Sequence, residues 1–140
     1  MKTSYAVLIA SAVGAVATGL AERRHRQRLT LDAEVIHQQL LADIATDPQQ
    51  QAIWATDGLP PQEYAEAVHC NRQISLLAVK FRTGLLNRHA LRVQARWLMQ
   101  RPAARAYWRR FGSFRKDEAV DRWDRHLVSV LAQEFTAVPG

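Results

Sequence analysis

The side chains of this chain that could do chemistry are one thiol, five imidazoles and a run of basic residues. Cys70 is the single cysteine, and it shares the apolar side of a helical pattern with Ile74 and Leu77. A thiol in apolar surroundings has a raised pKa and is inert. His69 is its neighbour, but adjacent residues on a helix point about 100° apart, so the two cannot hold one metal ion from a single turn. We therefore expect Cys70 to be a core residue.

The remaining histidines, His25, His37, His89 and His126, show no metal-ligand spacing. A structural zinc site needs clustered Cys and His residues. The carboxylates of the first half have no evident acid–base partner, and the chain has neither a glycine-rich phosphate loop nor a nucleophile-elbow pattern. We expect no catalytic residue, no metal and no cofactor, and hence a protein that is not an enzyme.

A basic stretch in the second half is the strongest candidate for a binding function. Residues 80–116 contain no Asp or Glu. Six of their arginines form two sets of three with four-residue spacing, which places each set on one ridge of a helix. We predict that these six bind an anion or a partner: Arg88, Arg92, Arg96, Arg101, Arg105 and Arg109. Trp97, Tyr107 and Trp108 lie among them.

Residues 29–71 have the opposite composition, because they contain no Lys or Arg and several Asp and Glu residues. Three interpretations of the basic stretch follow. Its arginines pair with this acidic half across a packed bundle, or they contact anionic lipid or an acidic protein at a membrane surface, or they bind nucleic-acid phosphates. Nucleic acid is the least expected partner, because no recognisable nucleic-acid-binding fold accompanies the arginines.

The beginning of the chain predicts a membrane anchor. No charged residue occurs from Thr3 to Ala21, and Glu22 is then followed by a collar of four arginines within residues 23–28. As a helix, residues 3–20 would extend about 27 Å, close to the roughly 30 Å of a bilayer core. We predict a transmembrane anchor over residues 1–28 and a helical domain over residues 29–140.

The collar also predicts the orientation of the anchor. Basic residues beside an apolar segment tend to stay in the cytoplasm, and only Lys2 and the terminal amine compete on the other side. We expect a single-pass protein of the inner membrane, with its N-terminus outside and its domain cytoplasmic. The alternative is a cleaved signal peptide with Ala15-Val16-Ala17 as its processing site, which would make this a secreted helical protein.

Small residues recur within the predicted anchor. Ala6, Ala10, Gly14 and Thr18 are spaced by four and share one helix face. Such a row lets two membrane helices approach closely, which predicts a homodimer formed through the anchor. The other interpretation is composition alone, since alanine and glycine are common in membrane helices.

Proline, glycine and apolar periodicity predict an all-α domain of about four to five helices. The first continues from the collar to about Thr46 and ends at Asp47-Pro48. A short helical turn is expected within residues 49–55, followed by a loop over 57–61. The other helices are expected over residues 61–83, 86–100, 102–110 and 113–137. Gly112 is taken as a break, and Val120 and Trp123 as part of the last apolar face. The helix over residues 86–100 is expected to be mostly buried, because Val93 and Trp97 belong to its wide apolar arc.

Several local motifs, taken together, resemble a family of small, uncharacterised, membrane-anchored helical proteins common in actinobacteria. They are the segment from Phe81 to Leu86, then Arg101-Pro102, then Arg105 with an aromatic pair, and finally Glu134-Phe135. The resemblance covers residues 40–135. The family pattern has Phe before Trp, whereas this chain has Tyr107 before Trp108. The resemblance implies fold and anchoring and carries no activity.

These observations together predict a non-enzymatic, membrane-tethered interaction or regulatory module at the cytoplasmic face. The alternatives are a nucleic-acid-binding or regulatory protein that uses residues 80–116, and the secreted protein described above.

Overall fold

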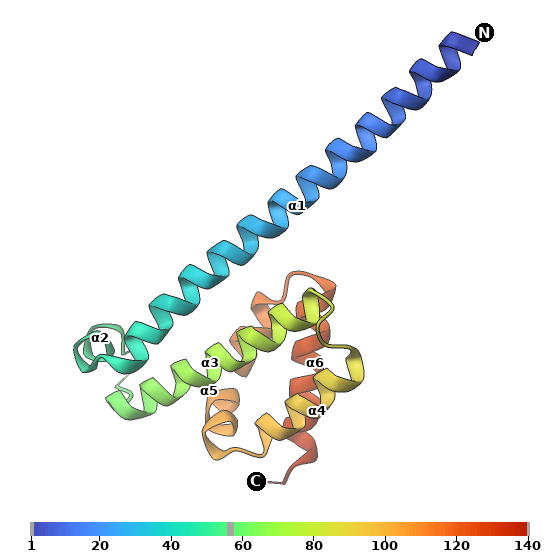
Figure 1. Ribbon diagram of the computed structural model, residues 1–140. Coiled ribbons are helices and arrows are strands. Elements are labelled where there is room, and N and C mark those ends of the chain that lie inside the picture. The colour runs from blue at the N-terminus through green and yellow to red at the C-terminus, as the bar shows by residue number, and fades with distance from the viewer. Residues whose placement is uncertain (1, 56–57, 140) are drawn as a thin grey trace. The chain divides into compact units, whose positions relative to one another are not determined.

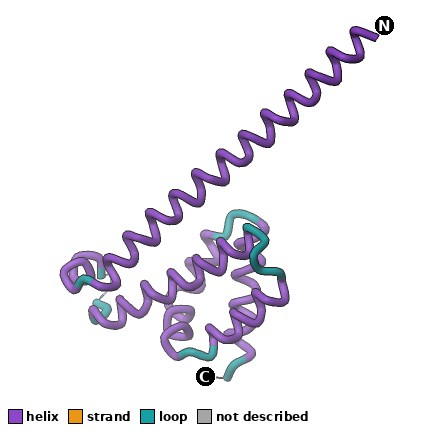
Figure 2. Tube along the Cα trace, in the orientation of Figure 1, coloured by secondary structure: helices purple, strands orange, loops and turns teal. Residues whose placement is uncertain are grey.

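The chain is built of α-helices joined by short loops (Figures 1 and 2). The computed structural model describes residues 2–55 and 58–139, with side chains from Tyr5 onward. Within these ranges there is no strand, which confirms the predicted all-α class. The helices are α1 (Lys2–Thr46), α2 (Pro48–Trp54), α3 (Pro61–Arg82), α4 (Arg88–Met99), α5 (Pro102–Glu118) and α6 (Arg122–Ala137).

The structure divides into two units, residues 1–40 and 41–140. The second unit contains the end of α1 together with α2–α6. The residues described above form six helices, against the four to five expected for the bundle, because α2 is a full helix and α1 continues into the second unit. The domain boundary predicted after residue 28 stays a prediction.

The helix ends follow local chemistry. At Asp47-Pro48, the proline cannot supply a backbone N–H and the Asp47 carboxylate accepts a bond from the Gln49 N–H at 2.9 Å, so α1 stops and α2 starts. Gly84 has a φ of +81° directly after α3, the left-handed conformation that glycine favours. Both stops are where the sequence predicted them. In the predicted loop, Gly58 is described and also has a positive φ, whereas Asp57 lies outside the described residues.

Helix α1 exposes its apolar segment completely. Every large apolar side chain from Tyr5 to Leu20 is between 49% and 68% exposed. The helix is long and apolar enough to cross a membrane, by length and composition alone, and it lies near the N-terminus. A signal sequence would satisfy the same test. The helix continues without interruption through the arginine collar.

The core of the second unit is formed by α3, α4, α5 and α6. Its largest fully buried side chains come from three of these helices: Ile74, Leu91, Met99, Val130 and Leu131. Helix α5 adds the fully buried Ala104. Cys70 lies at the edge of this core, where burial, and secondarily the charge of Glu66, raises the pKa of its thiol. A smaller cluster joins Ile44 and Ala45, at the end of α1, to Val68 of α3.

The prediction that Gly112 breaks a helix is wrong. Helix α5 runs through it to Glu118. A Cβ at position 112 would lie only 3.0 Å from Cε2 of Trp108, a buried residue one turn earlier. This glycine therefore gives room to an indole ring, and it supplies no turn.

The last helix begins at Arg122, not at Ser113. Asp121 is its N-cap, and one carboxylate oxygen accepts bonds from the N–H groups of Trp123 and Asp124, both at 2.9 Å. Val120 lies in the connection and is 82% exposed, so it is not part of the apolar face. Leu127, with Val130 and Leu131, is buried as predicted.

Candidate functional site: the arginine face of α4 and α5

Helix α4 presents the first three predicted arginines. The Asn87 side chain accepts a hydrogen bond from the Ala90 N–H at 2.8 Å and fixes the start of the helix. Leu91, Ala95 and Leu98 then face the core. The 3.6-residue period leaves Arg92 and Arg96 on the side that meets α6.

Arg92 and Arg96 converge on one carboxylate of α6. Arg92 Nη1 donates to Glu134 Oε1 at 3.1 Å, and Arg96 Nε donates to Oε2 at 3.1 Å. Arg92 Nη2 also donates to the Gln133 side-chain oxygen at 2.8 Å. Glu134 is 4% exposed. Two guanidinium groups thus hold a buried carboxylate by charge-assisted hydrogen bonds.

The electrostatics of this triad follow from its geometry. The hydrogen bond from Arg96 is the main cause that lowers the pKa of Glu134, against an opposing effect of burial, and Arg92 lowers it further. The same bond raises the pKa of Arg96. Glu134 is therefore ionised near neutral pH between two guanidinium groups, which proteins do not deprotonate, and one net positive charge remains on this side of α4.

The second set of arginines lies around the start of α5. The Arg101 guanidinium stacks on the indole of Trp97, with its carbon 3.5 Å from the ring centroid. Arg105 Nη1 donates to the carbonyls of Phe135 at 3.0 Å and Met99 at 3.4 Å. These carbonyls lie near the ends of α6 and α4, where a cation is favoured by the unpaired C=O groups and the helix dipole.

Arg88 and Arg109 are the two remaining members of the predicted set. Arg88 is exposed at the start of α4. Burial is the main cause that lowers the pKa of His126, and the charges of Arg88 and Arg92 lower it further. Arg109 is exposed on α5 and lines a groove. The structure thus brings Arg92 and Arg96 together on Glu134 and places Arg109 at a groove between α3 and α5 instead.

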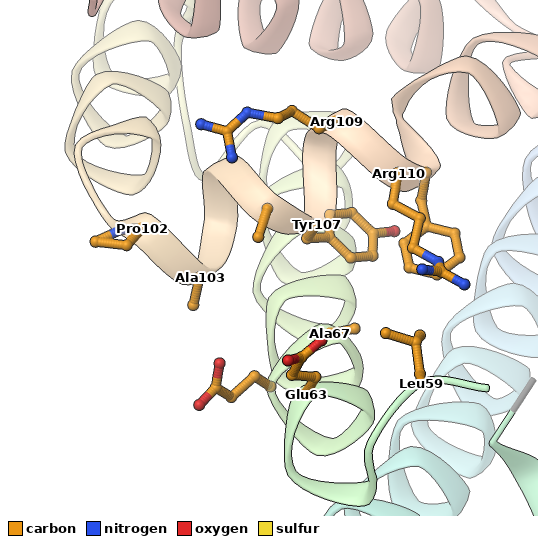
Figure 3. A pocket seen from close by; sticks show the side chains of 11 residues that line it. Leu59, Glu63, Ala67, Pro102, Ala103, Tyr107, Arg109 and Arg110 are labelled. Atoms are coloured by element: carbon orange, nitrogen blue, oxygen red, sulfur yellow. The ribbon is translucent and has the colours of Figure 1, made fainter. Parts of the chain in front are cut away.

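The groove that Arg109 lines lies between α3 and α5 and has a volume of about 600 Å³ (Figure 3). Helix α3 contributes the carboxylates of Glu63 and Glu66, and α5 contributes Arg109 and Arg110. The rest of its lining is mainly small or apolar: Leu59, Ala67, Pro102, Ala103, Ala106, Tyr107 and Phe111. The groove therefore carries both signs of charge around an apolar floor.

Two more arginines of the basic stretch join helices within the second unit. Arg82, at the end of α3, donates to Asp121 at 3.1 Å and to Asp124 at 2.7 Å. Arg115 of α5 bonds the Tyr107 hydroxyl at 3.1 Å, the Ser75 hydroxyl at 3.2 Å and the Asn71 side-chain oxygen. Arg82, Arg92 and Arg96 are all held by carboxylates from the last part of the chain, residues 121–134. The sequence interpretation looked for them in residues 29–71.

Sequence reasoning placed Val93 and Trp97 inside the bundle, and this placement is wrong. Val93 is 50% exposed and Trp97 is 55% exposed. They are four residues apart, so they share one helix face, and this face lies beside Arg96. Their closeness on a helical wheel to Arg92 and Arg96 was the available signal, because a side chain beside two arginines lies near the solvent edge.

The predicted packing row of α1 is exposed. Ala6, Ala10, Gly14 and Thr18 are all exposed. Thr18 Oγ1 donates to the Gly14 carbonyl at 2.9 Å, so its hydroxyl is bonded within its own helix. A Cβ added at Gly14 would meet no atom within 4 Å.

No three His, Cys, Asp or Glu side chains in the described ranges gather as metal ligands would. A family model described as a family of unknown function, DUF6082, matches residues 3–139. The chain belongs to this family. No curated protein and no solved structure matches it. Family membership supplies no activity, so function must be argued from the geometry.

The Glu134 triad predicts a stability that depends on pH. Glu134→Gln should lower the free energy of unfolding by about 1–3 kcal/mol, nearer the low end because both arginines are partly exposed. The folded pKa of Glu134 is lowered, so its contribution is complete above the unfolded value of about 4.3. It should disappear as the pH falls through the folded pKa.

Thermal unfolding of the full chain in mild detergent, followed by circular dichroism between pH 3 and 7, measures this difference. Glu118→Gln, at an exposed carboxylate of α5, is the control and should change little. Equal stability of the Glu134→Gln variant and the parent chain at pH 7 would contradict the assignment.

Proposed function

We propose that this protein is a non-enzymatic, membrane-tethered interaction or regulatory module. The first part of α1 lies in the inner membrane, and the helical domain lies at the cytoplasmic face. The observation that carries the proposal is the uncovered apolar surface of α1 from Tyr5 to Leu20. Exposing apolar surface to water costs roughly 25 cal/mol of free energy for each Å², and insertion into a bilayer removes this cost.

The collar supports the proposed orientation. The apolar segment is followed closely by Arg23, Arg24, Arg26 and Arg28. Arg26 forms an ion pair with Glu22 at 2.8 Å. This ion pair is exposed to solvent, and it neutralises one of the four positive charges of the collar. Basic residues at this position favour retention on the cytoplasmic side.

The placement of the arginines supports an interaction module over nucleic-acid binding. Arg82, Arg92, Arg96, Arg105 and Arg115 each bond to groups of their own chain. Phosphate recognition would need such groups to face outward. Proposed partners are anionic lipid or an acidic protein, and a second copy of the chain through α1.

Membrane attachment should depend on the apolar segment of α1. Val13→Asp places a charge near the middle of the proposed span, at a cost of about 2.5–3.5 kcal/mol. This variant should move from the membrane pellet to the soluble fraction after high-salt and carbonate washing. Ile36→Asp is a matched control, because Ile36 is equally exposed on the same helix beyond the collar, and it should stay in the pellet. If the Val13→Asp variant also remains in the membrane pellet, the proposal that α1 anchors the chain in the membrane is wrong.

Self-association through the row of small residues is tested by Gly14→Ile. Position 14 has open space around it within the chain, so a larger side chain disturbs only a neighbouring helix. A membrane reporter of helix dimerisation should lose signal with Gly14→Ile and keep it with Val16→Ile, which lies about 200° away around the helix. Equal signals from both variants would leave the row without a packing function.

A further inference from the structure

The outer face of α4 combines exposed apolar and basic side chains. His89, Val93 and Trp97 follow one another at four-residue spacing and form one stripe along the helix. All three are exposed, and Val93 and Trp97 are large apolar residues open to solvent. We call this stripe, with Arg101, the α4 outer face. It lies on the side of α4 away from Leu91 and Leu98, which are buried in the core.

Positive charge borders this face on both sides. Arg101 covers one side of the Trp97 ring at 3.5 Å and is exposed. Arg92 and Arg96 lie along the other border and share the single carboxylate of Glu134. That carboxylate is buried beneath them and balances only one of the two charges. The surroundings of Val93 and Trp97 are therefore net positive.

We propose that the α4 outer face binds the surface of an anionic bilayer. Trp97 and Val93 enter the interfacial region, and Arg101 contacts lipid phosphates. The net positive charge of Arg92, Arg96 and Glu134 attracts the anionic surface. Tryptophan is enriched at that depth because its ring is apolar and its N–H is polar. Helices with an apolar stripe and basic flanks lie in this interface, and arginine binds phosphate with two parallel donors.

Lipid fits these observations better than a nucleic acid does. A base would stack on the flat face of Trp97, but Arg101 already occupies one side of that ring. An exposed aliphatic side chain such as Val93 offers nothing to a phosphate backbone. A hydrocarbon boundary with anionic headgroups accommodates both the aliphatic group and the arginines.

This proposal rests on the proposed tether. A helix held in the same bilayer converts a weak surface contact into an intramolecular one with a high effective concentration. The α4 outer face is thus a second contact with the membrane, distinct from the span itself.

The test uses the full chain reconstituted in lipid nanodiscs. Cys70→Ala removes the single native thiol, and Val93→Cys accepts a nitroxide label. Oxygen collects in lipid and a nickel chelate collects in water, so the ratio of their collision rates with the label reports its surroundings. Discs with anionic lipid should give a several-fold higher oxygen-to-nickel ratio than discs of zwitterionic lipid. A nitroxide on Gln73→Cys, at an exposed position of α3, should give the same low oxygen-to-nickel ratio in anionic and in zwitterionic discs.

Arg101→Gln provides the second variant. It should lower the ratio at position 93 in anionic discs, whereas Arg110→Gln, at an exposed arginine of α5, should not. Arg101 makes no side-chain cap to α5, so the fold is expected to tolerate its loss. An unchanged ratio with Arg101→Gln would overturn the arginine contact.

A label at position 93 that stays in water in anionic discs would overturn lipid binding by this face, even if the chain has entered the disc. Entry is measured separately, by co-purification of the chain with the disc. A chain that does not enter contradicts the tether, and the proposal that rests on it falls with it. The two failures are therefore distinguishable.

Discussion

The packing of α6 against α3, α4 and α5 is the interaction on which the folded unit depends. Leu127, Val130 and Leu131 carry the apolar part of this packing. The same helix supplies Glu134, buried between two arginines of α4, and the segment at its start supplies the carboxylates that hold Arg82. Because a buried carboxylate is costly without partners, the basic stretch is needed to keep α6 in place. Much of the positive charge of the basic stretch therefore serves to stabilise the fold.

The sequence predicted the helices well where local chemistry decides them. Asp47-Pro48 and Gly84 end helices through backbone geometry, which is readable from single residues. The role of Gly112 could not be predicted in this way, because the glycine is needed to make room for the Trp108 ring one turn earlier. The helix boundary at Asp121 was also missed, because the helix predicted over residues 113–137 ran across it.

The candidate site was predictable in its residue types and not in its contacts. Four-residue spacing correctly put Arg92 and Arg96 on one ridge. Their partner Glu134 is about forty residues further along the chain, and charge composition pointed instead to residues 29–71. Trp97 was expected to be buried because it belongs to the apolar arc of the helix predicted over residues 86–100. Only the tertiary structure shows which side of α4 is covered by α6. Val93 and Trp97 lie outside that covered side and remain exposed.

Retention of α1 in the membrane, with the domain on the cytoplasmic side, is tested most directly by two measurements on a chain with a carboxyl-terminal tag. They are the intact mass of the purified chain and protease treatment of sealed right-side-out vesicles that contain it. A retained anchor predicts a mass that includes residues 1–20 and a tag that is digested only after the vesicles are opened. A chain shortened after Ala17, or a tag digested in sealed vesicles, would contradict it.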